Sequence, residues 1–149
     1  MGRNPDRLMI NNDQQAVRVR CNQKKPLQMR VFENILTDRG SKYAVSGGPV
    51  RDRAEAVAFV KELRRGKKFA KATHNTWAVL LDDVPLKNDD GESGAGMIIL
   101  RMLEREELRN HIVVVTRWYG GVKLGGDRFR RVQDAVRYYL EAAKPQQKL

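Results

Sequence analysis

The chain has 149 residues and a formal net charge of +11, from 29 Lys and Arg against 18 Asp and Glu. This length fits one domain with its own core, and the hydrophobic share of 41% is ordinary for a globular protein. The positive charge favours acidic partners such as nucleic acid, ribosomes or acidic proteins. Cys21 is the only cysteine, which excludes an intramolecular disulfide and suits a reducing compartment, so we expect a cytoplasmic protein. No apolar stretch is long enough for a membrane span, and no membrane partner is expected.

Residues 1–27 are polar and basic and are expected to form a flexible tail. Two short strands are predicted at 28–36 and 42–46, separated by a turn at Asp38–Arg39–Gly40. Gly47, Gly48 and Pro49 are expected to end the second strand.

The first helix is predicted to begin at Asp52, because Glu55 three residues later completes a capping box, and to end at Gly66. The buried face of this helix is expected to consist of Ala56, Phe59, Val60 and Leu63. A third strand is predicted at 74–81, and it leads into an acidic loop at 82–93.

Ser93 is expected to cap the second helix, and Asp127 the third. Between them, residues 111–119 form a β-branched run that is typical of a central strand. The apolar face of the second helix comprises Ala95, Ile98, Ile99, Met102 and Leu103; that of the third comprises Phe129, Val132, Ala135, Val136, Tyr139, Leu140 and Ala143.

The order β-β-α-β-α-β-α predicts an α+β domain over residues 28–143, a two-layer sandwich with its helices on one side, followed by a short tail at 144–149. The unit from 74 to 119 is expected to be a right-handed crossover between parallel strands.

Parallel strands would bring the acidic loop 82–93 and the glycine loop 119–127 to the same edge of the sheet. His74 and His111, which start these strands, would then lie at the opposite edge. We therefore predict that Arg117 pairs with Asp90 or Glu92.

The glycine loop has features of a phosphate-binding loop, since its four glycines and Lys123 precede a helix. It lacks a Gly-Lys-Ser/Thr ending and a G-x-G-x-x-G pattern, and a capping Asp127 would repel phosphate. A structural strand-to-helix turn is the favoured interpretation, and a nucleotide site is the alternative.

Asp89, Asp90 and Glu92 supply oxygens of the kind that bind metals, but the loop lacks the twelve-residue calcium pattern. A capped, partly salt-bridged loop is favoured, and no metal or other cofactor is expected. His74 and His111 are distant in sequence from Cys21 and from any nucleophile motif, so no catalytic residue is predicted and the protein is not expected to be an enzyme.

Basic residues are gathered in two segments. Residues 64–74 contain five Lys and Arg and no acid, and residues 117–137 contain six against two acids. Such segregation is typical of a docking surface, with a solvated helix face as the alternative. The candidate contacts to an anion, a nucleic acid or a partner are Arg64, Arg65, Lys67, Lys68, Lys71, Lys123, Arg128, Arg130 and Arg131.

Four segments, "ILTDRGSKYAV" (35–45), "KATHNTWA" (71–78), "DDGESGAG" (89–96) and "VVVTRWYGGVKLGGDRFRRV" (113–132), resemble the IMPACT family in order and spacing. The RWYGG and DRF forms look closer to the eukaryotic branch than to the bacterial YigZ branch. The residues that carry this family signature are Thr73, His74, Asp89, Asp90, Gly91, Glu92, Arg117, Trp118, Tyr119, Gly120, Gly121, Leu124, Gly125, Asp127, Arg128 and Phe129.

The resemblance implies a domain similar to the second domain of a small-subunit ribosomal protein and to domain IV of elongation factor G. It also implies a translational regulator that opposes activation of the amino-acid-starvation kinase and associates with ribosomes and actin. The RWD domain of eukaryotic members and the ferredoxin-like domain of bacterial members are not expected within these 149 residues.

Two functions follow from these observations. The first is a non-catalytic regulator of translation that binds the ribosome or a ribosome-associated regulatory protein, as part of a stress response. The alternative is a module that binds RNA or the ribosome directly through the basic segments 64–74 and 117–137. No small-molecule ligand is expected.

Overall fold

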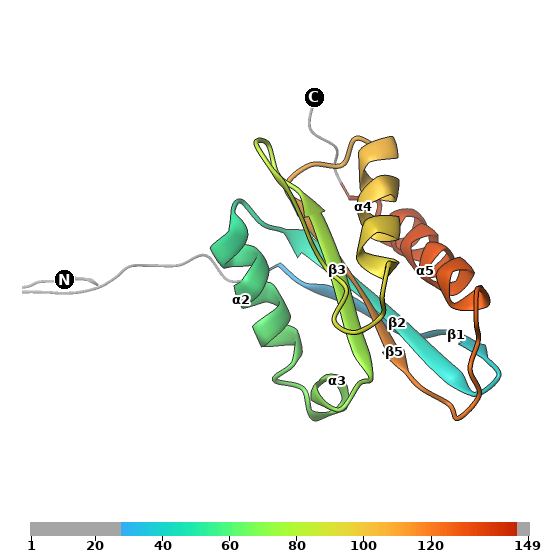
Figure 1. Ribbon diagram of the computed structural model, residues 1–149. Coiled ribbons are helices and arrows are strands. Elements are labelled where there is room, and N and C mark those ends of the chain that lie inside the picture. The colour runs from blue at the N-terminus through green and yellow to red at the C-terminus, as the bar shows by residue number, and fades with distance from the viewer. Residues whose placement is uncertain (1–27, 146–149) are drawn as a thin grey trace, which may run out of the picture.

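The structure, a computed structural model, describes residues 28–145, so the tail expected at 1–27 and most of the tail at 144–149 lie outside the described residues. One five-stranded antiparallel sheet with the order β1-β2-β5-β3-β4 forms its centre (Figure 1). The strands are β1 (Arg30–Asp38), β2 (Ser41–Pro49), β3 (His74–Leu80), β4 (Pro85–Asn88) and β5 (His111–Trp118), and the helices are α2 (Arg53–Leu63), α3 (Lys67–Ala70), α4 (Ala95–Arg105) and α5 (Asp127–Ala143).

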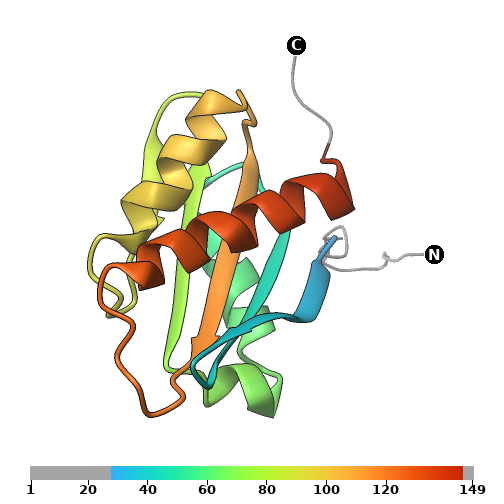
Figure 2. The same cartoon turned by 90° about the vertical axis from the view of Figure 1, so that its right-hand side faces the viewer.

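Helices cover both faces of the sheet, which corrects the expectation of a two-layer sandwich with helices on one side. Figure 2 shows α4 and α5 in front of the sheet, with α2 and α3 behind it. The mixed α+β class is confirmed, and the predicted elements occur in the predicted order with β4 and the one-turn helix α3 added.

Two cores follow from the alternation of side chains along the strands. Val113 and Val115 of β5 face the core under α4 and α5, whereas Ile112 and Val114 face the core under α2 and α3. A strand that is buried on both faces reads as a continuous apolar run, and β5 takes the central position that its sequence predicted.

Strand β4, which was not predicted from the sequence, makes β5 run antiparallel to β3 instead of parallel to it. It pairs antiparallel with β3, and α4 then returns the chain so that β5 is also antiparallel to β3. The predicted parallel crossover is therefore wrong. Strand β4 has four residues, of which only Leu86 is buried, and this is too few to give a strand pattern in the sequence.

Four predicted element ends can be compared with the structure: three helix starts and the end of the second strand. Asp52 caps α2 as predicted, accepting a hydrogen bond from the Glu55 backbone N–H at 2.8 Å. Ser93 does not cap α4, whose N-cap is Gly94, and Asp127 does not cap α5, whose N-cap is Gly126. Gly47 and Gly48 lie within β2 rather than after it.

Position 47 of β2 requires a glycine because the Tyr139 ring packs where a side chain would be: a Cβ there would lie 2.5 Å from the Tyr139 Cζ.

Within residues 28–145, no helix has both the length and the apolar composition to cross a membrane.

Candidate functional site

The acidic loop and the glycine loop meet at one end of the sheet, as predicted, although by a different path. Because β4 runs back along β3, the loop that follows it lies beside the start of β3, and His74 is the register partner of Arg117 at the end of β5. His74 therefore belongs to this end of the sheet. Only His111 lies at the opposite end, so the expected placement of both histidines away from the loops is wrong.

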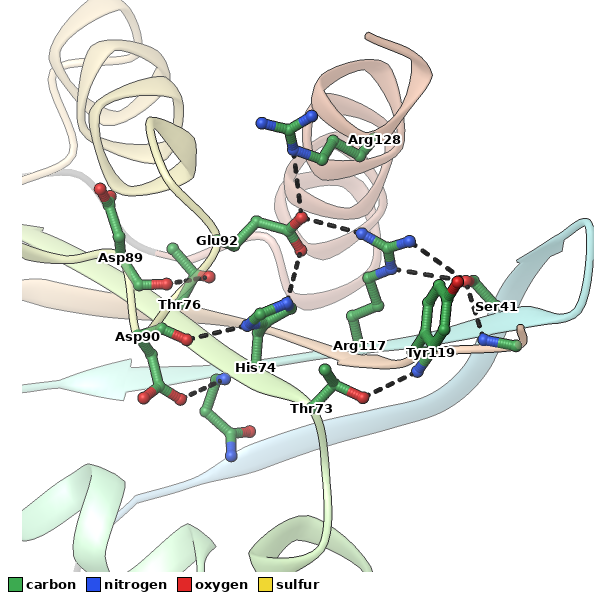
Figure 3. Close-up of polar contacts among 12 residues, drawn as sticks. Ser41, Thr73, His74, Thr76, Asp89, Asp90, Glu92, Arg117, Tyr119 and Arg128 are labelled. Atoms are coloured by element: carbon green, nitrogen blue, oxygen red, sulfur yellow. Dashed lines mark hydrogen bonds and ion pairs between the residues drawn. The ribbon is translucent and has the colours of Figure 1, made fainter. Parts of the chain in front are cut away.

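A buried carboxylate forms the centre of this end (Figure 3). Glu92 is 4% exposed, and its Oε2 lies 2.8 Å from the Nη1 of Arg117 and 3.3 Å from the Nε of Arg128. The Nε2 of His74 lies 3.9 Å from the other carboxylate oxygen. The predicted pairing of Arg117 is confirmed with Glu92, and we call Glu92, Arg117, Arg128 and His74 the clasp.

Arg117 also joins the clasp to the β1–β2 turn. Its Nη2 and Nε lie 3.3 and 3.4 Å from the hydroxyl of Ser41, which also accepts a hydrogen bond from the Gly120 backbone N–H at 3.2 Å. The guanidinium carbon lies 5.9 and 5.8 Å from the ring centroids of Tyr43 and Tyr119. Arg117 is buried, and its charge is therefore compensated by contacts within the protein itself.

His74 fixes the acidic loop against β3. Its Nδ1 lies 2.9 Å from the carbonyl oxygen of Asp90, and because a carbonyl only accepts, Nδ1 carries the hydrogen. The Asp90 carboxylate accepts a hydrogen bond from the Asn75 backbone N–H at 2.7 Å. Asp90 holds a positive φ of 48°, and Gly91 follows at 87°, so the loop turns sharply here.

Asp89 performs the capping that was expected of Ser93. Its carboxylate accepts hydrogen bonds from the backbone N–H groups of Gly94 and Gly96, at 3.0 and 2.7 Å. These hydrogen bonds, first that from Gly94, lower the pKa of Asp89. The acids of this loop therefore serve α4 and β3, and residues 28–145 contain no group of three or more His, Cys, Asp and Glu arranged to hold a metal ion.

The glycine loop makes a close backbone crossing. A Cβ on Gly120 would lie 2.0 Å from the carbonyl carbon of Gly40, so only glycine fits this approach. At the start of α5, the N–H groups of Asp127, Arg128 and Phe129 donate to loop carbonyls. These are the groups that a phosphate would need, so their use supports a structural turn. The Asp127 carboxylate instead accepts a hydrogen bond from Arg39 at 2.6 Å.

The remaining signature residues are packing or turn residues. Trp118 is partly buried against Phe69, with ring centroids 5.4 Å apart, and its indole N–H donates to the Lys68 carbonyl at 3.0 Å. The Thr73 hydroxyl accepts from the Tyr119 N–H at 2.9 Å. Leu124 is buried, Phe129 packs beside Gly94, and Gly121 and Gly125 have positive φ angles.

Ser41 and Tyr43 are two neighbours of the clasp that sequence reasoning missed. A single serine after a turn carries no signal of its own, and its role depends on the register that sets β2 beside β5.

The predicted basic residues separate into three groups. Arg117 and Arg128 serve the clasp, and Arg130 and Arg131 lie beside acids of their own helix, Asp127 at 3.7 Å and Asp134 at 3.4 Å. The other candidates are exposed; they are Arg64, Arg65, Lys67, Lys68, Lys71 and Lys123.

Comparisons with known proteins agree with these motifs. The family model of the Impact N-terminal domain matches residues 39–140. Protein IMPACT of Oryctolagus cuniculus is 34% identical over 140 residues, which are 87% of this chain and 44% of that protein. Protein IMPACT of Homo sapiens is 36% identical over 114 residues, 70% of this chain and 35% of that protein. The chain thus spans less than half the length of these relatives.

Two solved structures are similar. A crystal structure of a hypothetical protein has a TM-score of 0.65 at 23% identity, covering 78% of this chain and 62% of that one, and so shares the fold. The two-domain translational regulator Yih1 has a TM-score of 0.49 at 28% identity, covering 86% of this chain and 53% of that one.

Proposed function

This chain belongs to the IMPACT family, and we propose that it is a non-catalytic regulator of translation that binds an anionic surface of the ribosome or of a ribosome-associated regulatory protein. In this proposal, opposition to the amino-acid-starvation kinase is the downstream effect. Cytoplasmic location and association with a protein partner are parts of the same proposal.

One observation carries it: exposed lysines gather at the end of the sheet that the clasp holds. Lys42 is the register partner of Trp118, and Trp118 is hydrogen-bonded to the backbone of α3. Lys42 and the α3 segment that carries Lys67, Lys68 and Lys71 therefore both lie beside Trp118, and we call these four lysines the lysine end.

Most of this charge is unpaired. Lys68 contacts Glu33 at 2.7 Å with both side chains about half exposed, whereas Lys42, Lys67 and Lys71 have no ion pair with another described residue. Exposed ammonium groups without an internal partner raise the local potential and attract anions. The glycine loop, which contains exposed Lys123, starts at the end of β5 and thus at the same end of the sheet.

The clasp gives this surface a fixed shape. The Thr73 hydroxyl accepts a hydrogen bond from the Tyr119 N–H, and the Ser41 hydroxyl accepts from the Gly120 N–H and from Arg117. The starts of β3 and β2 are thereby joined to the end of β5 and the residues that follow it. A surface that is already ordered loses little conformational entropy when it binds. The polar groups of the clasp are occupied by one another, which supports a positioning role rather than catalysis.

Direct RNA contact is the second candidate, and Tyr119 favours it. Tyr119 follows Trp118 in the chain and is 48% exposed, and an exposed aromatic ring offers a base a face to stack on.

The proposal is tested by co-sedimentation with purified ribosomes. The triple variant Lys67→Glu, Lys68→Glu, Lys71→Glu should lower the bound fraction at least about tenfold, because phosphate contacts dominate such affinities. The matched control is Arg101→Glu, Arg105→Glu, Arg109→Glu, which makes the same charge change at exposed positions on and after α4. Equal loss in both variants, or no loss in the first, contradicts the proposal.

Salt-washed and unwashed ribosomes separate the two partners that the proposal names. Binding of the wild-type chain to unwashed ribosomes alone indicates a ribosome-associated protein as the partner. Equal binding to both preparations indicates direct contact with the ribosome, and no binding to either contradicts both.

A further inference from the structure

A surface hollow of about 470 Å³ lies between α2 and the β3–β4 side of the sheet. Val57, Val60, Lys61 and Arg64 line one wall. Their spacing of three, four and seven residues places them on one strip of the helix. Trp77 of β3 and Asn88 of β4, which are register partners, line the other side.

The hollow is apolar inside. Val57 is 51% exposed, more than any other large hydrophobic residue of the described chain, and Val60 is partly exposed. Trp77 is only 6% exposed, so it forms a floor rather than a free stacking face. Burying such exposed apolar surface is favourable by about 25 cal/mol per Å², which favours an occupant with a large apolar side chain.

The rim of the hollow is basic. Lys61 has no ion pair with another described residue, and the guanidinium of Arg64 lies 4.0 Å from Asp90. Arg65, also at the rim, lies 3.6 Å from Glu62. Both distances exceed the roughly 2.7–2.9 Å of a charge-assisted hydrogen bond, so donors remain for carboxylates of a partner.

We propose that this hollow docks an acidic peptide segment of a partner protein. A large apolar side chain of the peptide packs between Val57 and Trp77, and its carboxylates bind Lys61 and Arg64. Strand β4 lies at the edge of the sheet, and β3 is its one neighbouring strand within residues 28–145, so its outer side offers an extended segment a backbone to pair with.

A peptide fits these surroundings better than a nucleic acid does. The walls are aliphatic and the indole of Trp77 is covered, so the hollow presents no aromatic face for a base. The inference goes beyond the proposed ribosome binding and does not depend on it, because none of the four residues of the lysine end lines the hollow.

The probe is a peptide of about ten residues in which Asp and Glu alternate with Leu and Phe. Titrated into the isotope-labelled full chain, it should shift the NMR signals of Val57, Val60 and Trp77. One control peptide replaces Leu and Phe by Ser, and another replaces Asp and Glu by Asn and Gln. Each should bind at least about tenfold more weakly, because the hollow needs both the apolar and the charged contact.

Variants of the chain then locate the site. Val57→Glu and Lys61→Glu should each weaken peptide binding about tenfold or more, since each places a carboxylate against an acidic ligand. The matched controls Ala58→Glu, exposed on the same helix outside the hollow, and Arg101→Glu on α4 should stay within about twofold. Thermal unfolding of each variant confirms that it is folded.

Several results overturn the inference: no binding of the acidic peptide, equal binding of either control peptide, an equal effect of Ala58→Glu, or stronger shifts at the hollow with a single-stranded RNA of similar length. Peptide binding that survives Lys67→Glu and Lys71→Glu while ribosome binding is lost supports two separate surfaces. Peptide binding that is lost with these lysines places the peptide at the lysine end instead and overturns the inference.

Discussion

The two histidines that begin β3 and β5 lie at opposite ends of the sheet and in opposite surroundings. His74 lies among charges, with the Asp90 carbonyl on one ring nitrogen and Glu92 beside the other. His111 is partly buried, with its Nε2 2.6 Å from the Tyr139 hydroxyl, and burial lowers its pKa to about 4. One end of the sheet thus holds paired buried charge, and the other end holds a neutral pair.

Buried polar groups therefore have different roles at the two ends of the sheet. The charged end joins β2, β3, β5, α5 and two loops, and it carries the family signature and the lysine end. At the neutral end, the hydrogen bond between His111 and Tyr139 joins β5 to α5. We infer that the signature residues are a structural support for the binding surface beside them.

The largest expected effect is at the charged end. Glu92→Gln keeps the size of the side chain but leaves the buried guanidinium of Arg117 without its anion. Removing one partner of a buried pair costs about 3–5 kcal/mol, so the free energy of unfolding measured with urea should fall by that amount. Glu104→Gln, at an exposed position of α4, should change it by less than about 0.5 kcal/mol. Equal changes in the two variants would mean that the clasp does not hold the fold.

At the neutral end, we expect stability to depend on pH through His111. Its pKa is about 4 in the folded chain, against an ordinary 6.5 that applies to the unfolded chain. Between these values the unfolded chain binds more protons, so stability falls as pH falls from 6.5 to about 4. At about 1.4 kcal/mol per pKa unit, the loss should be roughly 3 kcal/mol.

Urea unfolding at a series of pH values measures this loss. His111→Gln should flatten the profile in that window, whereas His74→Gln should leave the contribution of His111 in place. A wild-type profile that is already flat between pH 6.5 and 4 would show that His111 is not neutral in the folded chain.

A smaller effect is expected at the backbone crossing of the charged end. Gly120→Ala places a Cβ 2.0 Å from the backbone of Gly40, and such overpacking costs about 1–3 kcal/mol. Gly126→Ala is the matched control, since its Cβ meets nothing within 4 Å and its φ is −65°. Urea unfolding should show a loss for Gly120→Ala alone. A Gly120→Ala chain as stable as the Gly126→Ala chain would show that the two loops do not cross as described.

The sequence predicted the order of the long elements, because β5 and the apolar faces of α4 and α5 have strong periodicity. It also predicted the Arg117–Glu92 pair, although from the wrong strand direction. The error arose at Pro85–Asn88, where a four-residue edge strand with one buried side chain reverses the chain. Without β4, the chain order is β3, α4, β5, and such a strand–helix–strand order predicts two parallel strands.

Capping residues were harder to predict because several polar residues compete for each helix end. Asp89 caps α4 from five residues before Gly94, a distance that only the turn at Asp90 and Gly91 makes possible. Asp127 is within hydrogen-bond reach of Arg39, 88 residues away in sequence, and binds it instead of capping its own helix. Such choices depend on tertiary contacts and leave no local pattern.

The most direct test of the account is the salt dependence of ribosome binding. The logarithm of the affinity of the wild-type chain for purified ribosomes should fall linearly with the logarithm of the salt concentration. In the variant Lys42→Ala, Lys67→Ala, Lys71→Ala, the slope should be shallower by roughly one for each lysine that contacts a phosphate, with the free energy of unfolding unchanged within about 0.5 kcal/mol. A flat slope for the wild-type chain, or the same slope in both proteins, would contradict the claim that the lysine end binds the ribosome.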